Sequence, residues 1–446
     1  MSQTLRCIVM GAAGRDFHDV QTFFRTHPGF RVLAITAAQI PFIDERAFPR
    51  ELAGPSYEAD IPIVDESELP RLVKEHAIDF VFLSYSDLSH VEVMHKAAIA
   101  EAAGASFALL GPRHTQLASR LPVIAVTASR TGAGKSPITQ FLAAHLRARG
   151  RRVGVLRHPM PYGDLRAQVV QRFATPDDLE RHRCTIEERE EYAPYVAMGM
   201  PIFAGVDYAR VLAAAEAEAD VILWDGGNND TPFLRPDLWI TVVDALRPGH
   251  ELAYHPGETN LRAAHVIVIS KVARARPEDV ATVEANVHAA NPAARVIHAD
   301  LRVRVEPDGA IEGKRVLVVE DGPTVTHGGM AFGAGTVAAR EGGARALVDP
   351  RPFAVGTIAQ AFGRYAHLGA VLPALGYSEA QRRELAETIE RAAPELVVDG
   401  SPAGVVDMLG ITLPCARVRY TLAQVSGPKL EALVDEALSG AATRKE

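Results

Sequence analysis

Short apolar runs rich in Val, Ile and Leu recur along the whole chain and alternate with stretches rich in Ala, Arg and Glu. The apolar runs have the length and composition of strands, and the stretches between them have the composition of helices. The runs lie at residues 6–11, 31–36, 79–85, 106–111, 122–128, 151–157, 220–226, 238–244, 266–271, 314–321, 345–350 and 395–400. Such alternation is typical of α/β domains with parallel sheets. We therefore predict an α/β fold of three-layer domains with mainly parallel sheets.

The length of 446 residues exceeds what one hydrophobic core usually supports. Polar breaks at residues 111–122 and 305–314 each separate one series of apolar runs from the next. We predict a Rossmann-like N-terminal domain (residues 1–120), a central phosphate-loop domain that binds nucleotide (residues 121–310) and a C-terminal α/β segment (residues 311–446).

Composition excludes several classes of protein. A net charge of -8 argues against a nucleic-acid-binding protein. No window approaches the roughly 20 consecutive apolar residues of a membrane span, and the chain starts without the pattern of a secretory signal. The three cysteines are far apart and form no CxxC, and no paired metal spacing occurs among the histidines, so neither disulfides nor a transition-metal site is predicted. We expect a cytoplasmic protein.

A glycine-rich loop at residues 129–136, Ser-Arg-Thr-Gly-Ala-Gly-Lys-Ser, follows one apolar run and precedes a helical pattern at residues 138–146. In such an arrangement, backbone N–H groups at the positive end of a helix surround a phosphate. Ser129 stands where the loop usually has glycine. A chance match in an ordinary loop is the alternative, which the flanking strand and helix disfavour. The predicted cofactor-binding residues of the loop are Thr131, Gly132, Ala133, Gly134, Lys135 and Ser136.

Two side chains of this loop and one acid downstream have predicted roles in the chemistry. Lys135 can reach the β- and γ-phosphate oxygens, and the Ser136 hydroxyl can bind Mg²⁺. The run at residues 219–225 ends in Asp225, followed by two glycines. This acid can hold Mg²⁺ through water or position the attacking group, or it can simply cap the following turn. We predict Lys135 and Asp225 as catalytic residues, and Ser136 and Asp225 as metal-binding residues.

The nucleotide base is expected near residues 270–273, Ser-Lys-Val-Ala, directly after an apolar run. Guanine is usually read by an acid two residues after such a lysine, and Ala273 replaces that acid. The stem of Lys271 can still stack on a base. ATP is therefore the favoured nucleotide, and GTP stays an alternative because Glu278 or Asp279 nearby could supply the carboxylate.

Taken in their order, these features resemble the cyclic 2,3-diphosphoglycerate synthetase family, and its bacterial branch in particular. The resemblance spans nearly the whole chain and is carried by MGAAGRDFH (10–18), the Thr-Gly-Ala-Gly-Lys-Ser loop (131–136), RHPMPYGDL (157–165), QRFAT (171–175), CTIEEREEY (184–192), WDGGNND (224–230), RPGHE (247–251), HPGETN (255–260) and VVEDGPTVTHGGMAFGAG (318–335). It implies an enzyme that uses ATP to close an intramolecular phosphoanhydride. The phosphate loop is also similar to that of dethiobiotin synthetases and metallochaperone NTPases. This second likeness implies a catalytic role for Arg130, which precedes the glycines, and a homodimer in which it acts across the interface.

Ring closure places several phosphates close together, which requires cations and oriented donors. Basic residues after the strands of the central domain are candidates, because ligands bind at that edge of a parallel sheet. A solvated surface position is the alternative for each arginine. His327 lies in a second glycine-rich loop, whose glycines could instead pack helix on strand. The predicted substrate-binding residues are Arg157, His158, Arg166, Arg172, Arg247, His250 and His327.

Two hypotheses about function are compatible with these residues. The first is an ATP- and Mg²⁺-dependent synthetase that activates a phosphate or carboxylate of a small phosphorylated or carboxylated acid, with Lys135 and Arg130 stabilising the transferred phosphoryl group. The second is a regulatory or metallochaperone-like GTPase or ATPase with a protein partner. Switch proteins of that kind usually carry the guanine-reading acid and often a Cys/His motif, and this chain has neither. The sequence therefore favours the enzyme.

Overall fold

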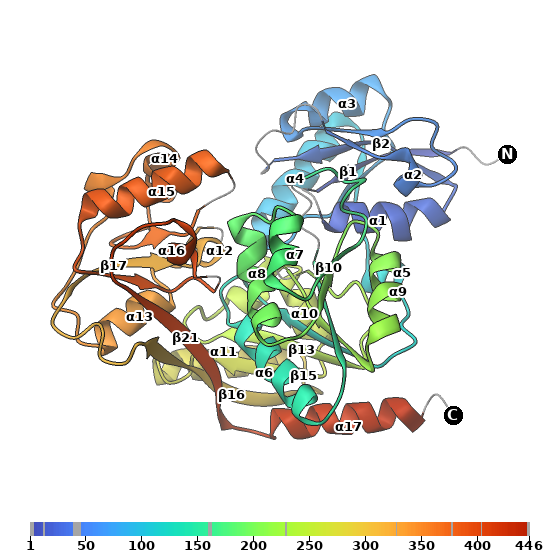
Figure 1. Cartoon of the computed structure of the whole chain (residues 1–446). Coiled ribbons are helices and arrows are strands. Elements are labelled where there is room, and N and C mark those ends of the chain that lie inside the picture. The colour runs from blue at the N-terminus through green and yellow to red at the C-terminus, as the bar shows by residue number, and fades with distance from the viewer. Residues whose placement is uncertain are drawn as a thin grey trace.

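The computed structural model describes residues 4–11, 14–38, 46–158, 163–227, 230–326, 328–375, 378–402 and 404–443. Figure 1 shows α/β layers in three parts, with the N-terminal part beside the central one and the C-terminal part on the opposite flank. The predicted α/β fold with mainly parallel sheets is confirmed. None of the helices in these ranges is long and apolar enough to cross a membrane.

The N-terminal part is a doubly wound sheet of strand order β3-β4-β2-β1-β5-β7. Its strands are β1 (Leu5–Met10), β2 (Phe30–Ala37), β3 (Ala47–Phe48), β4 (Ile61–Asp65), β5 (Phe80–Leu83) and β7 (Ser106–Leu109). Its helices are α1 (Arg15–Thr22), η1 (Phe24–Thr26), α2 (Arg50–Ala53), η2 (Glu66–Glu68), α3 (Leu69–Glu75), α4 (His90–Ala103) and α5 (Pro112–Thr115). Connections leave β1 toward β2 and later return to β5 on its other side. The switch point of the sheet therefore lies at the carboxyl ends of β1 and β5.

The central part places the strand before the phosphate loop in the middle of its sheet, in the order β10-β11-β9-β12-β8-β13-β15-β16. Its strands are β8 (Val123–Ala128), β9 (Val153–Arg157), β10 (Gln171–Phe173), β11 (Ile202–Ala204), β12 (Val221–Asp225), β13 (Leu238–Asp244), β15 (Val266–Ser270) and β16 (Arg295–Glu306). Its helices are α6 (Lys135–Ala148), α7 (Pro176–Arg181), α8 (Ile186–Ala197), α9 (Tyr208–Glu218), η3 (His250–Leu252), α10 (Gly257–Ala263) and α11 (Pro277–Ala290). Since β12 and β13 flank β8 in parallel, Asp225 and Asp244 end on either side of the loop.

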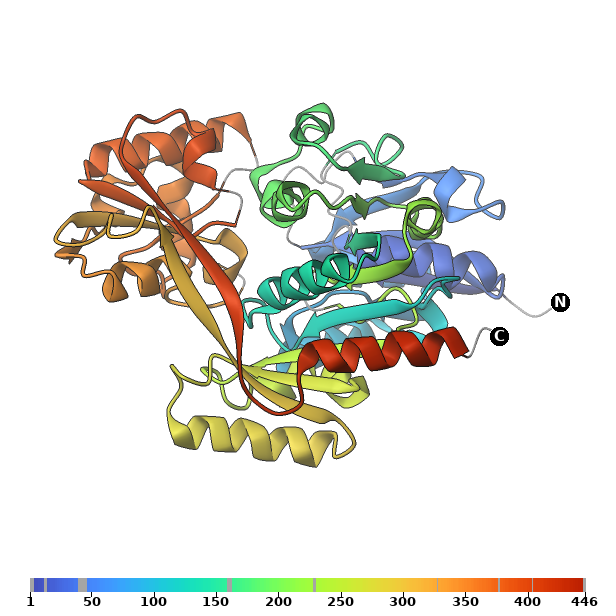
Figure 2. The same ribbon diagram turned by 60° about the horizontal axis from the view of Figure 1, so that its bottom comes forward.

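The C-terminal part continues the same sheet in the order β16-β21-β20-β17-β18, with β19 also paired to β17. Its strands are β17 (Arg315–Glu320), β18 (Ala346–Leu347), β19 (Leu372–Pro373), β20 (Leu396–Asp399) and β21 (Cys415–Ser426). Its helices are α12 (Gly322–Val325), α13 (Ala334–Glu341), η4 (Arg351–Phe353), α14 (Gly356–Arg364), α15 (Glu379–Ala392), α16 (Val405–Met408) and α17 (Leu430–Thr443). In Figure 2 the long strands β16 and β21 run together from the central to the C-terminal part.

The last helix returns to the central part instead of staying with the C-terminal part. Leu430, Leu433 and Val434 of α17 belong to the same buried cluster as Ile124 and Val126 of β8. The segment after residue 310 therefore contributes to two cores. Consequently the central and C-terminal parts are joined by paired strands and by a shared core rather than by a single linker.

Candidate active site

The phosphate loop lies between the end of β8 and the start of α6, as the sequence predicts. Gly132 and Gly134 have φ angles of 78° and 101°, in the left-handed region that favours glycine. A Cβ at Gly134 would lie 2.9 Å from Leu301 Cδ1. Ser129 is not among the residues with positive φ, and its backbone N–H donates to Val242 O over 2.9 Å. The first position of this loop therefore does not need glycine.

Asp225 is the centre of a buried network below the loop. Its side chain is 0 % exposed and accepts from Lys135, whose ammonium group is its ion-pair partner. Arg157 Nη1 lies 3.0 Å from Asp225 Oδ1, and Tyr195 donates its hydroxyl to Oδ2 over 2.8 Å. Burial opposes ionisation of Asp225, but Lys135 and Arg157 hold its pKa below the ordinary value. The carboxylate is therefore ionised near neutral pH and holds both cations in place.

Basic residues on the other side of the loop hold its backbone. Lys271 donates its ammonium to Gly132 O over 2.6 Å and to Asp244 Oδ2 over 2.8 Å. Arg247 donates to Thr131 O over 2.8 Å and lies 2.9 Å from Asp244 Oδ2. The ammonium of Lys271 is thus bound to the phosphate loop itself, a contact that the sequence does not predict. These pairs fix the loop from the side of β13.

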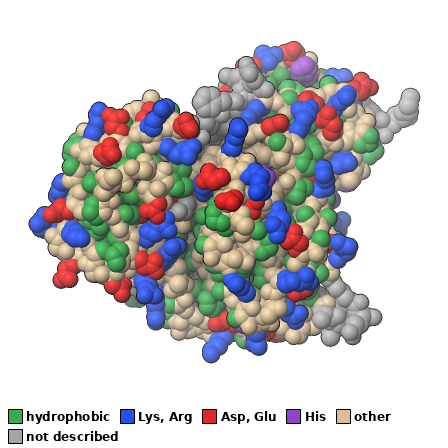
Figure 3. All heavy atoms as spheres, in the orientation of Figure 1, with side chains coloured by type: hydrophobic (Ala, Val, Ile, Leu, Met, Phe, Trp, Pro, Cys, Tyr) green, Lys and Arg blue, Asp and Glu red, His purple; other side chains and the backbone are tan. Residues whose placement is uncertain are grey.

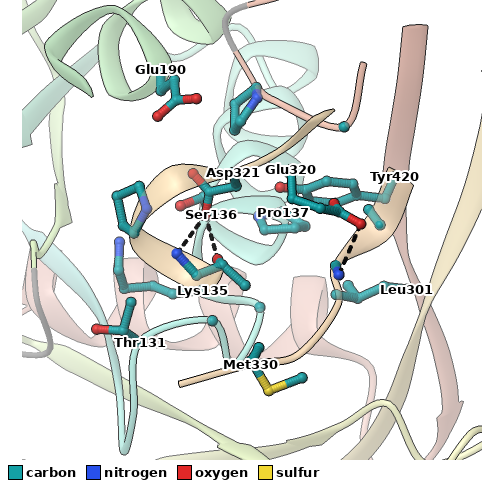
Figure 4. A pocket seen from close by; sticks show the side chains of 18 of the residues that line it. Thr131, Lys135, Ser136, Pro137, Glu190, Leu301, Glu320, Asp321, Met330 and Tyr420 are labelled. Carbon is teal, nitrogen blue, oxygen red and sulfur yellow. Dashed lines mark hydrogen bonds between the residues drawn. The ribbon is translucent and has the colours of Figure 1, made fainter. Parts of the chain in front are cut away.

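A cavity of about 170 Å³ opens in front of the loop, between the central and C-terminal parts. Figure 3 shows a furrow between these parts on the surface of the molecule, with acidic and basic side chains along it. Figure 4 shows that Lys135 and Ser136 of the phosphate loop line the same cavity as Asp321, Glu320 and Tyr420 of the C-terminal part. Glu190 from α8 lies above. The cavity thus brings the phosphate loop together with Glu190 of the central part and with Glu320 and Asp321 of the C-terminal part, and we call these three residues the acidic wall.

Glu320 at the end of β17 and Asp321 directly after it have no basic partner among the described residues. Glu320 accepts from the backbone N–H groups of Gly333, Gly335 and Thr336 over 2.7–3.0 Å, so it fixes the start of α13. Asp321 accepts from Thr324. Burial raises the pKa of Asp321 to about 6, and the neighbouring Glu191 and Glu320 add to the increase. No Lys or Arg of the described residues forms an ion pair with either acid, so a bound cation would be stabilised here.

The structure brings together some of the predicted substrate-binding residues and not others. Arg157 reaches the cavity, whereas Arg166 pairs with Asp60 over 2.8 Å and Arg172 pairs with Glu218, both at exposed positions outside the cavity lining. His158 is buried, with its ring against Gly14 of the N-terminal part, and its Nδ1 lies 2.5 Å from Oδ2 of Asp230 in the central part.

The remaining predicted residues lie around the loop or outside the described ranges. Arg130, Thr131, Gly132, Gly134, Lys135, Ser136 and Lys271 line the cavity. Ala133, in the middle of the loop, is buried. His250 accepts from Arg130 Nη1 over 3.1 Å. His327 lies outside the described residues.

Several side chains at the cavity were not predicted from the sequence. Glu191 pairs with Arg157, Tyr195 donates to Asp225, and Tyr420 lies on the far side beside Asp321. Glu191 and Tyr195 share one face of α8, four residues apart, which is a helical spacing the sequence displays. Asp321 follows an apolar run as Asp225 does. The position of Tyr420 depends on the β16–β21 pairing, for which no local signal exists.

Few protein oxygens of the described residues near the loop are available to a metal ion. Mg²⁺ usually keeps several waters and is held by one or two protein oxygens together with nucleotide phosphates. The Ser136 hydroxyl lines the cavity, while both oxygens of Asp225 are occupied by protein donors. No cluster of three or more acidic, His or Cys side chains suited to a metal occurs among the described residues. The residues therefore fit a nucleotide-bound Mg²⁺ at the Ser136 hydroxyl, whereas the predicted metal-binding role of Asp225 would compete with its bonds to Lys135, Thr139 and Tyr195.

Comparison with known proteins gives a full-length relative. The chain is 53% identical over 431 residues to arginine synthetase ArcE of Thermococcus kodakarensis, covering 97% of this chain and 96% of that protein. A tetraacyldisaccharide 4'-kinase of Verminephrobacter eiseniae is 37% identical over 118 residues, 25% of this chain and 26% of the kinase. Among solved structures, LpxK from Aquifex aeolicus in complex with ATP has a TM-score of 0.42 at 13% identity, covering 73% of this chain and 90% of that one. No model of a protein family matches.

Proposed function

This chain belongs to the family of arginine synthetase ArcE and is an ATP-dependent synthetase, and we propose that its product carries a guanidinium group, as arginine does. The observation that carries the proposal is the cavity in which the phosphate loop faces an acidic wall. The loop provides for a nucleotide, and the carboxylate of Asp321 in this wall, which forms no ion pair with a described Lys or Arg, suits a cationic group. The name of the full-length relative points to the same product class.

The roles of the residues follow from this arrangement. Mg²⁺ bound with the nucleotide would supply charge neutralisation at the β- and γ-phosphates. Lys135 and Arg130 stabilise the γ-phosphoryl group as it passes from ATP to the oxygen of a urea-type acceptor, with ADP as the leaving group. A nitrogen nucleophile such as ammonia then attacks the acceptor carbon and displaces phosphate, which forms the guanidinium group. Asp225 keeps Lys135 and Arg157 oriented at the floor of the cavity. Asp321 holds the cationic end of the product, and Glu320 supports this wall by fixing the start of α13.

Closure of 2,3-diphosphoglycerate into a cyclic phosphoanhydride is the second candidate, and the motif resemblance supports it. That acceptor carries two phosphates and a carboxylate, so its binding needs unpaired cations in the cavity. Arg157 is already paired with Asp225 and Glu191, and the wall across from the loop is acidic. These contacts disfavour a bis-phosphate acceptor and favour the guanidinium product.

Calorimetric titration separates the two candidates. With Mg²⁺ and ADP present, we expect arginine to bind the full chain and 2,3-diphosphoglycerate to bind at least about tenfold more weakly, as a buried charge facing like charges requires. Lysine and ornithine serve as comparisons for the guanidinium group. Preferential binding of 2,3-diphosphoglycerate would reject the guanidinium product.

We expect the affinity for arginine to decrease as pH is lowered, because Asp321 becomes protonated between pH 7.5 and pH 5. Only the ionised carboxylate attracts a cation, and its pKa of about 6 means that the charge is lost as pH falls through that value. The affinity at pH 5 should therefore be about tenfold below that at pH 7.5. Asp321→Asn should bind arginine weakly at both pH values. An unchanged pH profile in this variant would show that another group is responsible.

Nucleotide preference tests the base position. Ala273 is exposed directly after β15, where an acid would accept from guanine. We expect Ala273→Asp to raise the ratio of kcat/KM for GTP to that for ATP about tenfold, because the new carboxylate accepts hydrogen bonds from the guanine N–H groups. If steady-state kinetics show no change in this ratio, the base is read elsewhere in the chain.

A further inference from the structure

Arg130 of the phosphate loop is held by groups on three sides. Its Nε lies 2.9 Å from Asp87 Oδ1, its Nη1 donates to His250 Nδ1 over 3.1 Å, and its guanidinium carbon lies 3.6 Å from the ring centre of Tyr254. The side chain is 7% exposed, although it lines the nucleotide cavity. No described residue engages Nη2. One N–H face of a fixed guanidinium is thus left for a ligand oxygen.

The carboxylate that fixes Arg130 comes from the N-terminal part. Asp87 follows β5 at the switch point of that sheet, and its φ of 60° places it in the left-handed region. Its side chain is 8% exposed, and burial raises its pKa while Arg130 and Thr131 oppose the increase. A non-glycine residue in this backbone conformation costs energy that the surrounding structure must offset. The contact of Asp87 with Arg130 is therefore part of the interface between the N-terminal and central parts.

A short antiparallel sheet fastens the two parts at this point. Strand β6 (Leu88–Ser89) begins directly after Asp87 and pairs with β14 (Tyr254–His255), whose Tyr254 covers Arg130. His90 also donates its backbone N–H to Ala253 O over 2.9 Å. The acid and the aromatic ring on either side of the guanidinium are thus set in register by these paired strands.

We propose that Asp87 is a positioning residue, which holds Arg130 so that its Nη2 meets the γ-phosphoryl group during transfer. The inference rests on the proposed phosphoryl transfer at this loop and makes the N-terminal part a component of the active site. Because Asp87 pairs with Arg130 and is not among the residues that line the cavity, we expect its effect on the transferred group and not on ADP binding. Misplacement of a catalytic cation by about 1 Å lowers turnover by up to about 100-fold.

Binding of a transition-state mimic tests the proposal without knowledge of the acceptor. Aluminium fluoride with Mg²⁺ and ADP occupies the place of the transferred phosphoryl group. For the full-length Asp87→Asn variant, we expect affinity for ADP with aluminium fluoride to fall about 10- to 100-fold and affinity for Mg²⁺-ADP to stay within about twofold. Asp87→Glu should recover part of the loss. Equal weakening of both ligands, or no weakening, would overturn the positioning role.

A double-mutant cycle adds a readout that a merely structural role would not produce. In an Arg130→Ala background, Asp87→Asn should cause no further loss, because the group it positions is absent. Additive losses would overturn the proposal. The control is Asp60→Asn, which breaks the exposed pair with Arg166 between the same two parts and should leave both affinities unchanged. If the wild-type chain binds ADP but not the mimic, phosphoryl transfer at the loop fails and this inference fails with it.

Discussion

Lys135→Ala is expected to abolish turnover while the chain stays folded. We expect the Lys135 ammonium to reach the γ-phosphoryl group together with Arg130, and loss of one such charge-stabilising donor costs about 10²- to 10³-fold in kcat. Asp225 keeps Arg157, Tyr195 and Thr139 as partners in the variant, so its buried charge stays compensated. Phosphate release from Mg²⁺-ATP measures the activity, and thermal unfolding measures the fold.

Lys74→Ala is the matched control for this experiment. Lys74 is an exposed lysine on α3 of the N-terminal part, away from the cavity, so its removal should change neither activity nor stability. Turnover of Lys135→Ala at the wild-type rate would remove the phosphate loop from the mechanism. A variant that is inactive because it is unfolded would instead identify Lys135 as mainly a partner of Asp225.

Asp225→Ala is expected to lower the free energy of unfolding by about 3–5 kcal/mol. Removal of one member of a buried charge network leaves the other charges uncompensated, and here Lys135 loses its carboxylate partner. Activity should be lost as well, because Lys135 and Arg157 are no longer oriented. Urea denaturation at pH 7 measures the change in stability. Asp220→Ala, at the other end of β12, removes a partner of the exposed Arg152 and should cost less than about 1 kcal/mol.

The same carboxylate gives a defined dependence of stability on pH. Its pKa is lowered in the folded state, so its contribution is present above the unfolded value near 4 and is lost as pH falls further. The difference in stability between wild type and Asp225→Ala should therefore shrink on acidification below about pH 4. A difference that stays constant over this range would contradict the ionised network.

Local sequence patterns were sufficient for the nucleotide side of the site. The phosphate loop and Asp225 each follow a buried apolar strand, and parallel neighbours bring such strand ends together. The sequence predicts Lys271 at the nucleotide base, whereas the structure places its ammonium on Gly132 O of the phosphate loop, a contact that depends on the exact path of two loops. Ser129 departs from the usual motif at the first position of the loop. Glycine is required where φ is positive, and Ser129 is not among the residues with positive φ, so the structure tolerates serine there.

The acceptor side depends on contacts that no local pattern encodes. Strands β16 and β21 pair over residues 298–306 and 417–426, more than a hundred residues apart. Arginines alternate with apolar residues along them, at Arg302, Arg304, Arg417 and Arg419, so neither reads as a continuous apolar run. This pairing brings Asp321 and Tyr420 to the phosphate loop. Arg166 and Arg172 follow the expected strand but point to carboxylates on the surface, which sequence position alone cannot distinguish.

The most direct test of the proposed synthetase is ³¹P NMR of the purified full chain with Mg²⁺, ADP, phosphate and arginine. A synthetase catalyses both directions of its reaction, so an arginine-forming enzyme must produce ATP from these components. We predict that the β- and γ-phosphate signals of ATP appear only when arginine is present, and that Lys135→Ala gives none. Absence of ATP, together with a new phosphoanhydride signal when Mg²⁺-ATP and 2,3-diphosphoglycerate are supplied instead, would contradict the guanidinium product.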